Sequence, residues 1–283
     1  MVQYATCAAG CRRDRRLRHP ESKFDLVLAY PQWQGSGRFE NLARGAQASA
    51  DVCAAYGPLA RVAVTDEGEA SGGINRWTAI LRQFHAAKSI LNERQPGRIL
   101  TAGGDCSCDI AVIDYLLRRY PDLTVIWIDA HLDANTAMTS PSGNFHGMPV
   151  AMIMGAAPVE LSSHLGRPLS PSSFRYVSAH VGDEGEWAFQ REQGLGWLDP
   201  DQPPSGPVHI HFDLDALDPA EFPHVAYPEG KLSLEAGLSL VRAVGSSGNI
   251  VGLTITEFAP ADHAAVEDGR AFLRRLCEEA LAG

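Results

Sequence analysis

The sequence predicts an α/β fold with a doubly wound, mainly parallel sheet between two layers of helices, which gives a three-layer αβα arrangement. Short runs that are apolar on both faces alternate along the 283 residues with longer amphipathic segments. This alternation is typical of a parallel sheet that helices cover on each side. In addition, the polar clusters follow the ends of the predicted strands, where ligands bind in open α/β sheets.

The predicted strands are apolar runs such as LTVIWIDA, and they lie at residues 24–31, 98–104, 123–130, 173–181, 207–215 and 250–258, with a weaker one at 61–64. The predicted helices have an amphipathic pattern and lie at residues 75–93, 109–120, 234–245 and 271–282. The Pro- and Ser-rich pieces at 165–173 and 199–207 are of loop length. We therefore expect one domain over residues 21–283.

The first 20 residues differ from the rest, because they hold five Arg and one Asp. Their charge of +4 leaves −14 for the remainder, by subtraction from the total of −10. They lack the long apolar run of a secretory signal. We expect a disordered basic arm or an upstream start-site artefact, with a targeting or tethering arm as the alternative.

The net charge of −10 argues against nucleic acid and anionic membranes as partners, since both favour a basic surface. No stretch approaches the roughly 18 consecutive apolar residues of a membrane span. The chain is also too long to need disulfide stapling, so we expect free thiols and a cytoplasmic location. The six cysteines are Cys7, Cys11, Cys53, Cys106, Cys108 and Cys277.

Two strand ends carry polar residues at alternate positions. VIWIDAHLDAN places Asp129, His131 and Asp133 at the end of the strand predicted at 123–130. HIHFDLDALDP places Asp213 and Asp215 at the end of the strand predicted at 207–215. Residues two apart on a strand point to one side, so each group can converge on one point. Four carboxylates in one place repel one another unless cations neutralise them.

These residue types predict a dinuclear metal site. Oxygen ligands with a few imidazoles suit Mn²⁺, whereas Mg²⁺, Fe²⁺, Co²⁺ and Zn²⁺ are less distinctive alternatives. Five or six ligands are too many for one tetrahedral zinc ion and fit two ions that share carboxylates. His209 and His211 lie deeper in their strand, so we expect them to be interior residues, or residues that support the ligands from behind, rather than ligands.

Five motifs resemble the ureohydrolase family, which contains arginase, agmatinase and formimidoylglutamase. GGDCSCD, DAHLDANT, SGNFHGMP, DLDALDP and TEFAP occur in that family's order and spacing, from about Phe24 to the C-terminus. The resemblance implies an arginase-like catalytic domain that hydrolyses linear amidines. It also implies a homo-oligomer, either a trimer or a hexamer.

The resemblance further implies the role of each site residue. Asp129 and Asp213 would each bridge two Mn²⁺ ions, Asp133 and the residue at position 106 would bind one ion, and His131 with Asp215 would bind the other. Water activated between the ions would attack the guanidinium carbon. His146 would carry a proton to the leaving amine, and Glu257 would receive the guanidinium group.

The substrate is expected to be a small guanidino amino acid. In family members that take a free amino acid, an Asn, a Ser and an Asp hold its α-carboxylate and α-amino groups. Asn135, Ser142 and Asp183 occupy the matching places here, with Glu186 behind Asp183. These residues favour L-arginine or a derivative over agmatine, which has no carboxylate.

The main departure from the family is Cys106, which stands where a His ligand is usual. A thiolate is a soft ligand that suits Mn²⁺ poorly, and a thiol hardly binds, so one ion is expected to be weak, replaced or completed by water. The family branch that hydrolyses Nω-hydroxy-L-arginine is similar at this position. Cys108 is expected to be buried packing. The first loop, YPQWQGSGR, also lacks the usual Gly-Pro pattern.

Several functions remain open at this point. The favoured one is hydrolysis of L-arginine or Nω-hydroxy-L-arginine to ornithine and urea or hydroxyurea. Agmatinase and formimidoylglutamase are alternatives, although no Arg for the second carboxylate of formimidoylglutamate is evident. A metal-binding pseudoenzyme or regulatory subunit is the alternative of another class, because Cys106 replaces a usual histidine ligand with a poorer one. A deacetylase, epimerase or phosphohydrolase fits the motifs less well.

Overall fold

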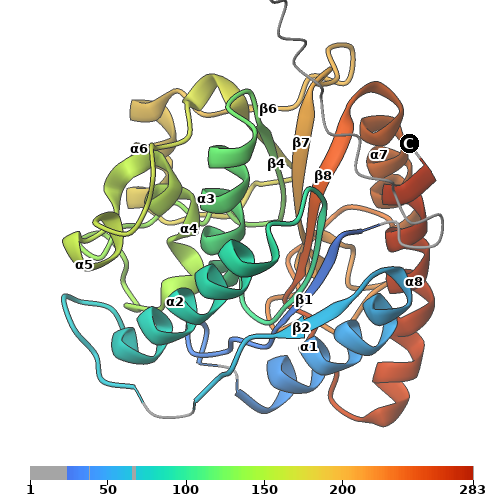
Figure 1. Cartoon of the computed structure of the whole chain (residues 1–283), viewed down its shortest axis with the longest axis horizontal. Coiled ribbons are helices and arrows are strands. Elements are labelled where there is room, and N and C mark those ends of the chain that lie inside the picture. Colours follow the sequence, from blue (N-terminus) through green and yellow to red (C-terminus); the bar gives the residue numbers. More distant parts are fainter. Residues whose placement is uncertain (1–23, 38, 66–67, 283) are drawn as a thin grey trace, which may run out of the picture.

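A single eight-stranded sheet forms the centre of the protein. The computed structural model describes residues 24–37, 39–65 and 68–282 (Figure 1). The strand order is β2-β1-β3-β8-β7-β4-β5-β6, and every neighbouring pair is parallel. The strands are β1 (Leu26–Tyr30), β2 (Leu59–Arg61), β3 (Ile99–Gly103), β4 (Thr124–Ile128), β5 (Phe174–Val177), β6 (Gly196–Trp197), β7 (Pro207–Asp213) and β8 (Asn249–Thr256).

Helices cover both faces of this sheet, which confirms the predicted three-layer αβα fold (Figure 1). One layer consists of α1 (Phe39–Cys53), α7 (Leu234–Ser247) and α8 (His263–Ala282). The other consists of α2 (Trp77–Arg94), α3 (Asp109–Arg119), α4 (Pro149–Ala151), α5 (Val159–Ser162) and α6 (Glu184–Gln193). Along β4, Val125 and Trp127 lie in the core on the side of α2 to α6, whereas Ile126 and Ile128 lie in the core on the side of α1, α7 and α8. The strand is therefore apolar on both faces.

The helices at 75–93, 109–120 and 234–245 agree with the sequence pattern, but other elements differ from it. The last helix begins at His263 rather than at residue 271. The sequence pattern does not single out α1, whose buried face is built largely from small residues such as Ala46 and Ala50. Gly45 is required there, because an added Cβ would lie 1.7 Å from the Phe258 carbonyl oxygen.

Two strand expectations need adjustment, and one strand was not expected. The strand expected at 173–181 ends at Val177, because Ser178 has a left-handed φ of 67°. The weak strand at 61–64 is shifted, since β2 ends at Arg61. The two-residue β6 has no distinct sequence signal. The expected basic arm at 1–20 lies outside the described residues.

The sheet order explains why the polar motifs meet. Strands β3, β8, β7 and β4 are consecutive neighbours at the centre of the sheet, and all four run in one direction. Their carboxyl ends therefore share one edge, which is where ligand sites form in open parallel sheets. Within the described ranges, no helix combines the length and the apolar character needed to cross a bilayer.

Candidate metal centre

The carboxyl end of β4 carries the first group of predicted ligands. Asp129 directly follows β4 and is buried, and its Oδ2 accepts a 3.0 Å hydrogen bond from Trp127 Nε1. Its Oδ1 accepts a 2.7 Å bond from the backbone nitrogen of His131. Asp133 is also buried and has a left-handed φ of 49°. A left-handed φ is uncommon in a residue other than glycine, and strained backbone positions of this kind cluster at functional sites.

The carboxyl end of β7 carries the second group. Asp213 ends the strand, and its Oδ1 accepts a 2.7 Å hydrogen bond from the backbone nitrogen of Asp215. Asp215 Oδ2 lies 3.2 Å from His131 Nδ1, so the ends of β4 and β7 meet. Two clusters of candidate ligands share Asp129, and the ligand atoms within each cluster lie within 4.8 Å of one another. The first cluster consists of Cys106, Asp129, His211 and Asp213, and the second consists of Asp129, His131 and Asp215.

Cys106 lies in the turn after β3 and is buried beside these carboxylates. Its Sγ donates to Asp213 Oδ2 at 2.7 Å and lies 3.7 Å from Glu257 Oε1. Burial and then the negative charge of Asp213 raise the pKa of the Cys106 thiol well above its ordinary value. The thiol therefore keeps its proton at neutral pH in this setting, and a protonated thiol is a poor metal ligand.

Three buried carboxylate oxygens at this site have no hydrogen-bond partner. They are Asp133 Oδ2, Asp215 Oδ1 and Glu257 Oε2. Burial and mutual repulsion raise the pKa of Asp215 to about 6 and those of Asp133, Asp213 and Glu257 well above the ordinary range. Unpaired buried carboxylates cost free energy. The carboxylate oxygens of this site face one region, and the nearby positive charge is too small to balance them. A pair of divalent cations would supply the missing charge.

His131 is held between this cluster and a loop that follows β7. Burial alone would lower the pKa of His131, but hydrogen bonds to Asp129 and Asp215 outweigh burial and raise the pKa well above its ordinary value. Its Nε2 lies 2.7 Å from Glu229 Oε2. The Tyr227 ring lies 5.9 Å from the His131 ring and 5.3 Å from the His146 ring, measured between centroids.

The sequence does not single out Tyr227 or Glu229. They lie in an irregular loop with no strand or helix period, so no local pattern places them at the site. The only available signal is that the loop begins directly after the DLDALDP motif.

The expected catalytic pair, His146 and Glu257, lies on the other side of the pocket. His146 Nδ1 is 3.8 Å from Glu257 Oε1, and the side chains are 19% and 1% exposed. Glu257 directly follows β8 and has a left-handed φ of 58°. The arrangement puts a partly exposed imidazole next to a buried acid that has one oxygen without a hydrogen-bond partner.

The four expected substrate-binding residues line the same pocket. Asn135 Nδ2 donates to Asp183 Oδ2 at 3.0 Å. Glu186 Oε1 and Oε2 accept backbone hydrogen bonds from Ala134 at 3.0 Å and Asp183 at 2.7 Å. Glu186 therefore ties the start of α6 to the loop after β4. Ser142 Oγ accepts from the backbone nitrogen of Asn144 at 3.1 Å.

The unusual first loop supports the site through Asp105. Gln32 Nε2 donates to Asp105 Oδ1 at 3.0 Å, and the Gly35 backbone nitrogen donates to Oδ2 at 2.8 Å. The Gly35 carbonyl in turn accepts a 3.3 Å hydrogen bond from the His146 backbone nitrogen. The loop thus connects the turn that carries Cys106 to the turn that carries His146.

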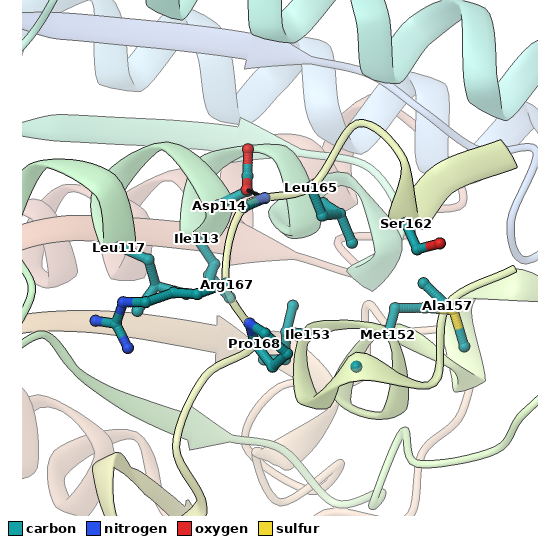
Figure 2. Close-up of a pocket in the computed structure, with 12 residues that line it drawn as sticks. Ile113, Asp114, Leu117, Met152, Ile153, Ala157, Ser162, Leu165, Arg167 and Pro168 are labelled. Atoms are coloured by element: carbon teal, nitrogen blue, oxygen red, sulfur yellow. Dashed lines mark hydrogen bonds between the residues drawn. The ribbon is translucent and has the colours of Figure 1, made fainter. Parts of the chain in front are cut away.

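A second pocket lies between α3 and the segment 152–168 (Figure 2). Its lining is mainly apolar, as Ile113, Leu117 and Leu165 illustrate. Its one acid, Asp114, pairs with Lys88 at 3.0 Å and accepts a hydrogen bond from the Gly166 backbone nitrogen at 2.6 Å. It contains neither of the candidate ligand clusters. The pocket at the carboxyl edge of the sheet, with about 560 Å³ of empty volume including open solvent, is therefore the candidate site.

Solved structures with similar folds include several arginases. The Entamoeba histolytica arginase in complex with L-ornithine superposes with a TM-score of 0.77, covering 93% of this chain and 99% of that one, at 21% identity. Proclavaminate amidino hydrolase from Streptomyces clavuligerus gives a TM-score of 0.65, covering 92% and 93%, at 19% identity. At these identities the likeness concerns the fold.

Sequence relatives extend the similarity to the chain itself. The arginase of Saccharomyces cerevisiae is 33% identical over 57% of this chain, and human arginase-1 is 32% identical over 62%. The matched segments span 56% and 62% of those two proteins. A model of the arginase family matches residues 39–282, which is most of the sequence. The resemblance seen in the motifs is thus confirmed, and the chain belongs to the arginase family.

Proposed function

We propose that the protein is a dinuclear, manganese-dependent amidinohydrolase that acts on L-arginine or a close derivative such as Nω-hydroxy-L-arginine. The products would be ornithine and urea or hydroxyurea. One observation carries this proposal: separate strands bring Asp129 and Asp213 to one buried site where other carboxylate oxygens lack partners. Divalent cations offset the repulsion of such a cluster.

The two candidate clusters overlap at Asp129, which supports a carboxylate shared by two ions. By the family resemblance, Asp129 and Asp213 would contact both ions, Asp133 would contact one, and His131 with Asp215 would contact the other. When bound, divalent cations lower the pKa of water so that hydroxide is available at neutral pH. Oxygen-rich ligand sets favour Mn²⁺ over softer metals.

The remaining chemistry falls to two side chains. The buried Glu257 carboxylate would accept hydrogen bonds from the planar guanidinium group and orient its carbon. As the C–O bond forms and the C–N bond to ornithine breaks, the leaving nitrogen needs a proton. His146 is partly exposed beside Glu257, so it can deliver that proton and recover another from solvent.

The opposite wall of the pocket supports an amino-acid substrate. The bonded pair Asn135 and Asp183 offers amide and carboxylate groups, and Ser142 adds a hydroxyl. These groups match an α-carboxylate and an α-amino group. The L-ornithine in the Entamoeba histolytica arginase complex is the product expected here.

Cys106 favours a second candidate, a metal-binding protein without hydrolase activity. Its thiol donates to Asp213 instead of offering a lone pair to a cation. Agmatine hydrolysis is a further alternative, since a putative agmatinase from Clostridium difficile shares the fold with a TM-score of 0.65.

We further propose a homo-oligomer, either a trimer or a hexamer, in the cytoplasm. The assembly is inferred from the family resemblance, and light scattering after size-exclusion chromatography would test it. The location is supported by four buried free cysteines, Cys53, Cys106, Cys108 and Cys277, because structural disulfides are typical of oxidising compartments.

A metal count joined to a substrate panel tests the proposed function. The protein is stripped with chelator, reloaded with Mn²⁺ and offered arginine, Nω-hydroxyarginine, agmatine and formimidoylglutamate. We expect two ions per chain and turnover of a guanidino amino acid, with both lost in Asp129→Asn and retained in Asp201→Asn, an exposed control. Two ions without turnover would indicate the pseudoenzyme, and failure to bind any divalent ion would refute the metal centre.

A further inference from the structure

We propose that His211 supplies the imidazole ligand of the cluster that contains Cys106, and that Asp109 holds the His211 ring in the ligating tautomer. The inference deepens the proposed function and rests on its metal centre. It replaces the expectation that His211 is an interior or supporting residue rather than a ligand.

The backbone fixes where the His211 side chain points. His211 lies two residues before Asp213 on β7, so the two side chains share one face of the sheet. It pairs in register with Trp127 on β4 and Thr254 on β8. The His211 and Trp127 rings stack with centroids 3.5 Å apart and an interplanar angle of 3°. The imidazole is fully buried and held in one orientation.

Asp109 determines which nitrogen of His211 carries the hydrogen. Asp109 Oδ2 lies 2.9 Å from His211 Nδ1, and a carboxylate only accepts, so Nδ1 donates. Asp109 Oδ1 accepts a further 2.6 Å hydrogen bond from Thr254. In the neutral form of the ring, a hydrogen on Nδ1 leaves the lone pair on Nε2.

That lone pair lies at the candidate metal cluster. His211 Nε2 is 3.3 Å from Thr256 Oγ1, and this hydroxyl can instead donate to Asp213 Oδ2 at 3.4 Å. His211 belongs with Cys106, Asp129 and Asp213 to the group whose ligand atoms lie within 4.8 Å of one another. A carboxylate that orients a histidine toward a metal is a common arrangement in metalloproteins.

Cys106 has a different part in this cluster. Its thiol donates to Asp213 Oδ2 at 2.7 Å and so orients a carboxylate. Of the two side chains in the cluster that are not carboxylates, only His211 presents a free lone pair of the type that Mn²⁺ accepts.

His209 provides a matched comparison on the same strand. It is equally buried and is also bonded to Asp109 Oδ2, through Nε2 at 2.7 Å. Its Nδ1 faces Gly252 instead, where an added Cβ would lie 2.2 Å away. Neither candidate ligand cluster includes His209.

Replacing each histidine separates ligation from support of the Asp109 network. We expect His211→Gln to lose one of two Mn²⁺ ions, or to bind it at least about tenfold more weakly by calorimetry. His209→Gln should keep both ions, and Cys106→His should restore the lost ion in the His211→Gln background. Equal metal binding by wild-type and His211→Gln protein, or equal losses in both single variants, would overturn the proposal.

A measurement on the unmutated protein covers the case in which the His211 variant does not fold. In Co²⁺-loaded protein, each coordinated histidine contributes one paramagnetically shifted N–H resonance. We expect two, from His131 and His211, with slow solvent exchange for the buried Nδ1–H, and no near-ultraviolet thiolate-to-cobalt band. Two bound ions with only one shifted N–H, or with a thiolate band, would reject ligation by His211 and would leave the proposed function standing. Absence of bound metal would reject the proposed function instead.

Discussion

Nε2 of His131 lies 2.7 Å from Oε2 of Glu229, although the two residues are 98 positions apart. The same ring presents Nδ1 to Asp129 and Asp215. Glu229 therefore fixes the tautomer in which Nδ1 can bind a cation, which is the common role of an acid behind a metal-binding histidine.

Removing this acid should weaken one metal site. We expect Glu229→Ala to lower Mn²⁺ affinity by about 10- to 100-fold, because the His131 ring loses its support. Glu229→Gln should recover part of the affinity, since its carbonyl oxygen still accepts from Nε2. Titration calorimetry with Mn²⁺ measures the effect, with substitution of the exposed Glu160 in α5, Glu160→Ala, as the control. Identical affinities in all four proteins would show that Glu229 has no positioning role.

The loop that carries Glu229 and Tyr227 is held by close backbone packing. An added Cβ at Gly230 would lie 2.3 Å from backbone atoms of Asp215, Ala216 and Leu217. Lys231 and Leu232 also donate backbone hydrogen bonds to the Ala216 carbonyl at 3.1 and 3.0 Å. The loop is thus fixed directly against the turn that carries a predicted metal ligand.

Gly230→Ala should therefore disturb both stability and the site. We expect it to lower the free energy of unfolding by about 1–3 kcal/mol, the usual cost of overpacking, and to weaken Mn²⁺ binding. Gly196→Ala is the matched control, because an added Cβ there meets no atom within 4 Å. Urea unfolding measures the difference, and equal stability of the two variants would contradict the packing argument.

The pair Asn135 and Asp183 should determine how well the pocket selects amino acids. We expect Asn135→Ala and Asp183→Ala to raise KM for the guanidino amino acid by about tenfold or more, with a smaller change in kcat, since the interaction is far from the reacting carbon. Agmatine lacks the α-carboxylate, so any activity on it should change less. Steady-state kinetics on both substrates provides the test. An equal loss on both would point to damage of the whole loop rather than lost recognition.

The sequence pattern predicts the sheet and the acidic strand ends because both depend on local periodicity. Buried parallel strands are continuous apolar runs, and alternate residues at a strand end share one face. The pattern does not predict the contribution of Glu229, Tyr227 or the Asp105 contacts, since these arise from loops that meet only in the folded chain. Nor does the pattern predict the contact of His211 with Asp109, because the two residues are 102 positions apart and meet only in the folded chain.

The pKa shifts predict how the stability of the metal-free protein depends on pH. Asp215 has an ordinary pKa of 3.8 and a folded pKa of about 6, so between these values the folded chain binds more protons than the unfolded chain. Stability then falls as pH rises. Burial and neighbouring acids also raise the pKa values of Asp133 and Glu257 well above the ordinary range, so these acids act in the same direction. The raised pKa of His131 acts in the same direction.

The metal-free protein should therefore melt at a higher temperature at about pH 5.5 than at about pH 8. The lowered pKa of Asp109 has the opposite effect, but only at more acidic pH, where this acid protonates in the unfolded chain. Mn²⁺ should reverse the trend, because deprotonated ligands bind it more tightly and the stabilisation by metal grows with pH. Differential scanning calorimetry with chelator and with Mn²⁺ measures both slopes. A chelated protein that is more stable at about pH 8 would mean that the acids at the carboxyl edge are not mutually destabilising.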